Sequence, residues 1–316
     1  MRVLQVWMRR AFHHEAVFYA SDEEYVAGLL PDLRSALGAD GAVLVAVAPD
    51  KVRLLSAALG ADAERVEFTD MEQLGRNPAC IIPAWREFMA TAGSGPPLGI
   101  GEPVWPGRSD AELVECRRHE SMLNLAFDGG APWRLLCPYD VRALAPEVLA
   151  DARHNHPHVT DDGVSHPCPD YLEPPKVLSW DGALPAPGSP VTELEFTRED
   201  AALVRTFVGE YASAAGIGGA RLDDLVLAVH ELATNTMRHG GGRGVLRAWR
   251  ENGTLLCEVA DRGHIADPLA GRERPPDRYG GGRGLWMVNH LCDLVQLRTS
   301  RAGNVVRLHM SLSAAA

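Results

Sequence analysis

The chain has 316 residues, of which 46% are hydrophobic, enough for two domains that each bury a core. The formal net charge of −11 argues against a protein that grips nucleic acid through its phosphates. No apolar run is long enough for a signal peptide or a membrane span. Six cysteines without a Cys-x-x-Cys pair suit a reducing compartment, so we expect a cytoplasmic protein without membrane contact.

From His13 to about Arg153, short apolar runs alternate with segments of helical periodicity. Buried strands are expected at 42–50, 65–70, 97–104 and 133–140, and helices at 22–37, 77–92 and 109–127. This alternation predicts repeated β-α-β units, that is, an α/β domain with a mainly parallel sheet. Loops at the carboxyl ends of such strands are common ligand sites.

Residues 155–192 interrupt this pattern with eight prolines, which predicts a linker or an extended arm. We place the first domain at 12–154, the linker at 155–190 and the second domain at 191–316. The stretch also holds possible zinc ligands, namely His154, His156, His158, His166 and Cys168. Alternate positions on an extended segment do not close a tetrahedron, so exposed linker histidines are the expected account.

The second half has a different order of elements. We expect a strand from Val191, helices near 198–214 and 220–239, strands at 244–250 and 254–261, a helix at 284–294, and strands at 294–300 and 304–312. The sequence "ENGT" between the second and third strands is a hairpin signal of the Asn-Gly type. Helices followed by hairpins predict an α+β sandwich, in which helices cover one face of a mostly antiparallel sheet.

Three segments of this second half carry polar residues or glycines at positions where ligands often bind. Glu231, Asn235 and His239 lie at successive turns on one helix face, which by itself is typical of a solvated surface. Asp261 ends an apolar strand just before Gly263. Four glycines (Gly280, Gly281, Gly282 and Gly284) precede a helix, whose first N–H groups are suited to binding an anion.

In this order, "HELATNTMRHG", "DRG" and "GGGRGLWMVNHL" resemble the N box and the two glycine boxes of the GHKL ATP-binding domain, also called the Bergerat fold. The resemblance covers roughly 191–312. Because no dimerisation helices are fused to it, the domain is most similar to anti-sigma factor serine kinases of the SpoIIAB and RsbW type. Two positions depart from the pattern: His264-Ile265 replaces a second glycine, and Asn304 follows Gly303 where threonine is common.

The resemblance implies a role for each motif position. Asn235 would ligate the Mg²⁺ of bound ATP, Glu231 would be the general base, and Asp261 would accept the adenine amino group. Further nucleotide contacts would come from His239, Gly263, Gly280, Gly281, Gly282, Arg283, Gly284 and Leu285. It also implies a kinase that phosphorylates a serine or threonine of a STAS-domain anti-anti-sigma protein. The same kinase would sequester a sigma factor and form a homodimer.

Two alternatives to this kinase remain open. The domain could be a non-catalytic switch, in which the nucleotide shapes the surface that binds the sigma factor or its antagonist. It could also be a sensor histidine kinase, but that class needs a helical hairpin with a phosphorylatable histidine directly before the ATP domain. The proline-rich stretch at 155–192 disfavours such a hairpin.

The first half is similar to the MEDS sensory domain, whose fold resembles RecA-like proteins. The resemblance spans about 12–158 and is carried by "HHEAVFYASDEEY" (13–25), "GIGEPVWPGR" (99–108), "RRHESMLNLAF" (117–127) and "LCPYD" (136–140). Without a Walker lysine, ATP hydrolysis in this half is not expected. Residues that would form a pocket for a small-molecule signal are His13, Glu102, Trp105, Arg108, His119, Glu120, Tyr139 and Asp140. Alternatively, Trp105 and its neighbouring prolines stiffen a loop, and His119–Glu120 cap or pack a helix.

Overall fold

The computed structural model describes residues 12–161, 163–179, 182–275 and 282–312. The chain forms two compact units, residues 1–180 and 181–316. Among the described residues, no helix is long and apolar enough to cross a membrane.

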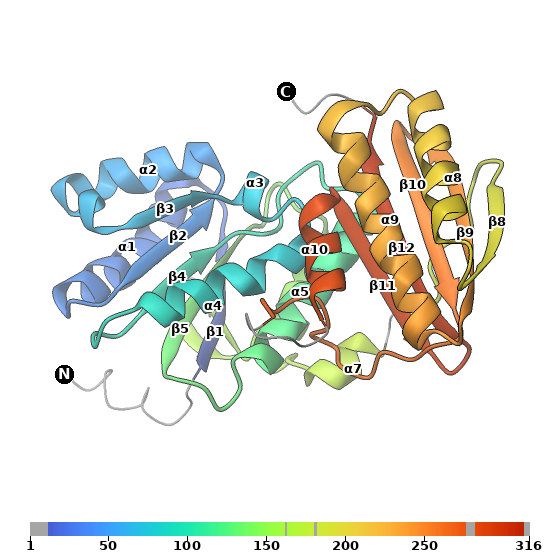
Figure 1. Cartoon of the computed structure of the whole chain (residues 1–316). Helices are drawn as coiled ribbons and strands as arrows, with labels where there is room; N and C mark the ends of the chain where they lie inside the picture. Colours follow the sequence, from blue (N-terminus) through green and yellow to red (C-terminus); the bar gives the residue numbers. More distant parts are fainter. Residues whose placement is uncertain (1–11, 162, 180–181, 276–281, 313–316) are drawn as a thin grey trace. The chain divides into compact units, whose positions relative to one another are not determined.

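The first unit is a seven-stranded sheet with helices between its strands (Figure 1). Its elements are β1 (Phe12–Tyr19), α1 (Asp22–Gly38), β2 (Val43–Val47), α2 (Pro49–Leu59), β3 (Glu67–Asp70), α3 (Met71–Leu74), α4 (Ile81–Thr91), β4 (Leu98–Gly101), α5 (Asp110–Ala126), β5 (Trp133–Asp140), α6 (Pro146–Asn155), β6 (His158–Asp161), β7 (Val164–Pro167) and α7 (Pro174–Leu178). The strand order is β3-β2-β4-β5-β1-β6-β7, and only the β6–β7 pair is antiparallel among the described strands. The predicted mainly parallel sheet is confirmed.

Strand β1 was not among the expected strands, although it lies inside the sheet between β5 and β6. Its apolar run is interrupted by His13, His14 and Glu15, three residues that are usually exposed. All three are buried, and His13 Nε2 donates to Glu15 Oε2 at 2.7 Å. Buried polar groups of this kind need partners, and the neighbouring elements supply them.

The stretch that we expected to be a linker contributes β6, β7 and α7 to the first unit. β6 pairs with β1 in parallel, and α7 packs against α5. Strands of four residues are too short to give a periodic signal, which explains why the proline content dominated the prediction. His156, at the end of α6, is fully buried, so the expectation that it is an exposed linker histidine is wrong.

The second unit is a five-stranded sheet in the order β11-β12-β10-β9-β8, with antiparallel pairing throughout the described strands. Its elements are β8 (Thr192–Thr197), α8 (Ala201–Ala214), α9 (Gly219–His239), β9 (Arg243–Glu251), β10 (Thr254–Asp261), α10 (Arg283–Leu291), β11 (Leu294–Ser300) and β12 (Gly303–Ser311). The predicted α+β sandwich is confirmed. Figure 1 shows α8, α9 and α10 on one face of this sheet.

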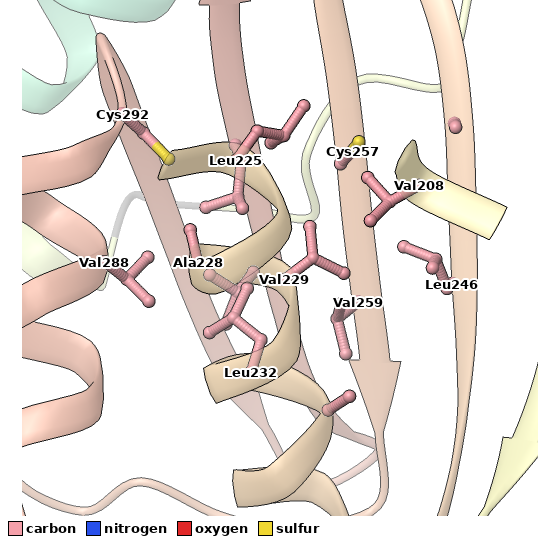
Figure 2. Close-up of a cluster of buried hydrophobic side chains, with 14 of the residues drawn as sticks. Val208, Leu225, Ala228, Val229, Leu232, Leu246, Cys257, Val259, Val288 and Cys292 are labelled. Carbon is pink, nitrogen blue, oxygen red and sulfur yellow. The ribbon is translucent and has the colours of Figure 1, made fainter. Parts of the chain in front are cut away.

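The core of the second unit lies between α9 and the sheet (Figure 2). Leu225, Val229 and Leu232 on α9 are buried and pack with Cys257 and Val259 of β10. Ala228 of α9 and Val288 of α10 extend the same cluster, which explains how α10 is anchored beside α9. Because α9 turns its apolar face to the sheet, its polar face is left for other contacts.

Candidate functional site

The polar face of α9 carries Glu231 and Asn235, both half-buried, and His239, which is exposed. The start of α10 lies close against the first two. A Cβ atom built on Gly284 would be 3.0 Å from Glu231 Oε2 and 3.1 Å from Asn235 Nδ2. A residue with a side chain would therefore displace both groups, and glycine at this position permits the approach of the two helices.

A cavity of about 590 Å³ opens beside this contact. Six of the residues predicted from the sequence line it: Asn235, His239, Asp261, Gly282, Gly284 and Leu285. Glu231 borders it through its approach to Gly284, whereas Gly280 and Gly281 lie outside the described residues. The volume is in the range of pockets that bind small molecules and cofactors.

Asp261 is held at the wall of this cavity by three hydrogen bonds. Its Oδ2 accepts from Thr236 Oγ1 at 2.7 Å, and its Oδ1 accepts from Gly263 N at 2.8 Å and Asn304 Nδ2 at 3.0 Å. A carboxylate offers about four acceptor positions, so one remains for a donor in the cavity. The side chain is thus fixed in place and still able to recognise an amino group.

The two departures from the family pattern belong to the same hydrogen-bond network. Asn304 faces Asp261 across the β10–β12 pair, and its Oδ1 accepts from Thr299 Oγ1 at 2.8 Å. Thr299 Oγ1 in turn lies 3.1 Å from His264 Nδ1. Asn304 and Thr236 support Asp261 in this way, and neither was predicted from the sequence to do so. Thr236 is almost fully buried. Its hydroxyl on the otherwise apolar face of α9 was the feature of the sequence that indicated a buried hydrogen bond.

Helix α10 begins at the floor of the cavity. Its N-cap residue, Gly282, has a φ of 108°, a left-handed conformation that favours glycine. The first N–H groups of a helix have no partner within the helix and attract anions. Asn289 Nδ2 donates to Gly271 O at 2.9 Å and so ties the segment after β10 to this helix. The cavity thus combines an acceptor at Asp261 with the N–H groups at the start of α10.

The predicted sensory residues of the first unit are distributed over several places. Arg108 lies with its guanidinium 3.5 Å above the Trp105 ring centroid and donates to Gly75 O and Pro103 O. These contacts fix the loop after β4, which agrees with the alternative that Trp105 and its neighbours stiffen a loop. Asp140 accepts from the Arg142 backbone N–H at 2.9 Å, a turn contact.

Glu102 is buried beside Tyr19, whose hydroxyl donates to Glu102 Oε1 at 2.7 Å. Its other oxygen, Oε2, is buried without a hydrogen bond to any described residue. Burial raises the pKa of Glu102 to about 7 despite the opposing effects of Tyr19 and Lys51. This carboxyl group therefore changes its charge near neutral pH.

His119, Glu120 and Tyr139 are buried on α5 and β5. Glu120 and Tyr139 line a cavity of only about 20 Å³, the size of a single water molecule. Of the eight predicted sensory side chains, Glu120 and Tyr139 share this small cavity. Glu120 also faces His14, Cys137 and His156.

Comparisons with known proteins agree with this division. Residues 13–157 match the MEDS family, the methanogen/methylotroph, DcmR sensory domain, and residues 194–310 match the histidine kinase-like ATPase domain. A comparison with curated proteins finds no match. Among solved structures, the chain is similar to the RsbU and RsbW domains of Rv1364c from Mycobacterium tuberculosis, with 21% identity and a TM-score of 0.31.

That match covers 40% of this chain and 34% of the mycobacterial chain, so it spans about a third of the latter. The two family matches cover most of the described residues of the two units, and each lies within one unit. The chain therefore carries a MEDS domain in its first unit and a histidine kinase-like ATPase domain in its second.

Proposed function

We propose that the second unit binds ATP with Mg²⁺, sequesters a sigma factor, and phosphorylates a serine or threonine of a STAS-domain anti-anti-sigma protein. The first unit would supply the signal through a small molecule. The observation that carries the proposal is the convergence of Asn235, Asp261 and the start of α10 on one cavity, with Glu231 at its edge.

The residues of the cavity suit this reaction. Bound ATP would supply the phosphoryl group. The Asn235 amide oxygen is a hard ligand of the kind that Mg²⁺ prefers. Glu231 lies one turn earlier on the same helix face. Its carboxylate would accept the proton of the attacking hydroxyl as ADP leaves. The remaining acceptor position of Asp261 suits the amino group of adenine.

The elements that precede the second unit favour a separate protein as the phosphate acceptor. In the described residues between α6 and β8, the elements are the short strands β6 and β7 and the five-residue helix α7. None of these is a long helix of the kind that presents a phosphorylatable histidine in a histidine kinase. This arrangement supports the serine or threonine kinase over the histidine kinase.

The test is phosphate transfer by the full chain from Mg²⁺-ATP to STAS-domain proteins of the same organism. Wild type should form phosphoserine or phosphothreonine. Glu231→Gln should lower the rate by roughly 100-fold or more, because a general base typically contributes that much. ATP binding measured by calorimetry should persist in this variant. The matched control is Glu210→Gln on α8, an exposed carboxylate outside the cavity lining, which should leave both measurements unchanged.

Two results would overturn the proposal in different ways. If wild type captures a sigma factor in the presence of ATP but phosphorylates no STAS-domain protein, the non-catalytic switch replaces the kinase. If the chain binds no ATP, both nucleotide-dependent functions fail. Asn235→Ala separates the two cases further, because it should weaken Mg²⁺-dependent binding without removing the Asp261 contacts.

A further inference from the structure

Four buried side chains of the first unit bring their donor atoms together. His14 lies on β1, Glu120 on α5, Cys137 on β5 and His156 directly after α6. One nitrogen, oxygen or sulfur atom from each lies within 4.8 Å of those of the other three. None of the four residues is more than 1% exposed. The cluster is therefore enclosed by the core of the first unit.

The sheet register explains the placement. β1 and β5 pair in parallel, with His14 opposite Leu135, so Cys137 lies two positions further along on the same face as His14. Helices α5 and α6 contact each other and bring Glu120 and His156 to the same point. Four elements that are distant in sequence thus meet at one place.

The hydrogen bonds of the two imidazoles determine where their protons lie. His156 Nδ1 is 2.7 Å from Ala152 O, and a carbonyl oxygen only accepts, so Nδ1 carries the proton. His14 Nδ1 is 3.1 Å from Asn124 Oδ1. Asn124 Nδ2 donates to Asn155 O at 2.8 Å, which orients the amide so that its oxygen faces His14.

Both Nε2 atoms are consequently left with lone pairs that point into the cluster. His14 Nε2 lies 3.0 Å and His156 Nε2 lies 3.4 Å from the same oxygen, Glu120 Oε2. In the described structure, His156 Nε2 and Glu120 Oε1 are buried without a hydrogen bond. Two imidazolium ions would repel each other, because the ring centroids are 4.0 Å apart. A cation between the donor atoms would satisfy both Nε2 atoms and Glu120 Oε2 at once.

Four of the six distances between donor atoms are close to those of tetrahedral coordination. For zinc bonds of about 2.05 Å to nitrogen or oxygen and about 2.3 Å to sulfur, tetrahedral ligand atoms lie roughly 3.3 to 3.6 Å apart. In the structure, Glu120 Oε2 lies 3.0 Å from His14 Nε2 and 3.4 Å from His156 Nε2, and Cys137 Sγ lies 3.4 Å from His14 Nε2 and 3.8 Å from Glu120 Oε2. Small side-chain adjustments would complete the geometry.

We propose that His14, Glu120, Cys137 and His156 form a buried zinc site in the first unit. The set of two imidazoles, one thiolate and one carboxylate suits this borderline ion, whereas Mg²⁺ and Ca²⁺ take oxygen ligands. On binding, the Cys137 thiol loses its proton to solvent. The thiolate and carboxylate then neutralise the dication, so the buried site carries no net charge. This inference is independent of the proposed kinase function.

Asn124 and the Ala152 carbonyl are positioning groups for the two histidines. Zinc-bound histidines typically donate their second N–H to an oxygen acceptor, and both do so here. The alternative for the same atoms is a metal-free network, in which one shared proton links the histidines to Glu120 and the cluster only stabilises the core.

Cobalt(II) uptake by the full-length chain, after treatment with a chelator, separates the two. A zinc site should take up one Co²⁺ per chain, with the intense visible bands of tetrahedral coordination and a near-ultraviolet thiolate-to-cobalt charge-transfer band. Stoichiometric Zn²⁺ should bleach both. Cys137→Ala should lose the charge-transfer band. Cys116→Ala is the matched control, because Cys116 is equally buried in the same unit but donates to Pro103 O outside the cluster.

Asn124→Ala tests the positioning role without touching a ligand. It should keep the cobalt spectrum and weaken metal affinity by about 10- to 100-fold. The site is refuted if chelator-treated wild type, still folded by circular dichroism, binds no cobalt stoichiometrically. It is also refuted if folded Cys137→Ala gives the wild-type spectrum. The wild-type experiment decides the matter even if a variant does not fold.

Discussion

The two units place their polar groups in contrasting surroundings. In the first unit, His14, Glu120 and Cys137 are enclosed between sheet and helices. In the second, Asn235 and Asp261 line an open cavity of about 590 Å³. A buried polar group must be matched by its neighbours or by an ion, whereas a group on a cavity wall can keep an acceptor position for a ligand. Substitutions in the first unit should therefore change stability and metal content, and those in the second should change nucleotide affinity.

The contrast is sharpest at Glu102, which is buried with a hydrogen bond to only one of its two carboxylate oxygens among the described residues. Its pKa is raised from 4.5 to about 7, mainly by burial. Because the folded-state pKa is above that of the unfolded chain, folding favours the protonated form. The first unit should thus lose stability as pH rises from about 4.5 to about 7, by about 3 kcal/mol at 1.36 kcal/mol per pKa unit.

This pH effect is measured as a difference between wild type and Glu102→Gln. Hydrogen exchange of the β4 amides in urea reports the first unit alone, between about pH 5 and about pH 8. Subtracting the variant removes the contributions of other groups, including Asp50, Asp140 and Lys51, whose charges act on Glu102. Glu147→Gln on α6, an exposed carboxylate, is the control and should follow wild type. Parallel curves for wild type and Glu102→Gln would contradict the prediction.

In the second unit, a substitution at Asp261 should change the affinity for ATP. Asp261→Asn removes a charged acceptor from the cavity wall and should weaken ATP binding by about 10- to 100-fold, since hydrogen bonds to charged groups contribute about 1.5–3 kcal/mol. Calorimetric titration of the full chain with ATP measures the loss.

Inosine triphosphate separates recognition from folding, because it lacks the amino group. Wild type should prefer ATP over inosine triphosphate, and Asp261→Asn should lose this preference even if the variant is somewhat less stable. If the preference survives in the variant, Asp261 does not read the amino group. The second unit would then bind nucleotide by a different set of contacts.

The sequence was informative about the second unit because its motif residues lie close together along the chain. Glu231, Asn235 and His239 follow each other on one helix, and Asp261 ends the second strand after it. The helical period and the strand end therefore suffice to predict where these residues lie. Their hydrogen-bond partners are harder to predict, since Asn304 reaches Asp261 only through the β10–β12 register.

The first unit shows where such local patterns stop being useful. His14 and His156 come from opposite ends of the unit, and their convergence depends on the β1–β5 register and on how α5 and α6 pack. β1 was missed because His13, His14 and Glu15 interrupt an apolar run. That interruption was the available signal: polar residues within a strand-like segment indicate a strand whose polar side chains are paired inside the core.

The smallest effect is expected at Asn304, which tests whether Asp261 depends on its support. Asn304→Ala removes one donor to Asp261 Oδ1 and leaves Gly263 N in place. Asp261 keeps two other hydrogen bonds, so the effect on ATP is indirect and affinity should fall by about 3- to 10-fold, or about 0.5–1.5 kcal/mol. The preference for ATP over inosine triphosphate should narrow but persist.

The control for Asn304 lies at the other end of the same network. Thr299→Val removes the hydroxyl that donates to Asn304 Oδ1 and leaves the Asn304–Asp261 bond intact. Its effect on affinity should be smaller than that of Asn304→Ala. Asn304→Thr, with the residue common in the family, should recover part of the affinity if a hydroxyl can replace the amide donor. If Thr299→Val and Asn304→Ala lose the same amount of ATP affinity, Asn304 orders the β11–β12 turn rather than Asp261. The Asp261 carboxylate would then be held in the cavity wall by Thr236 and Gly263 alone.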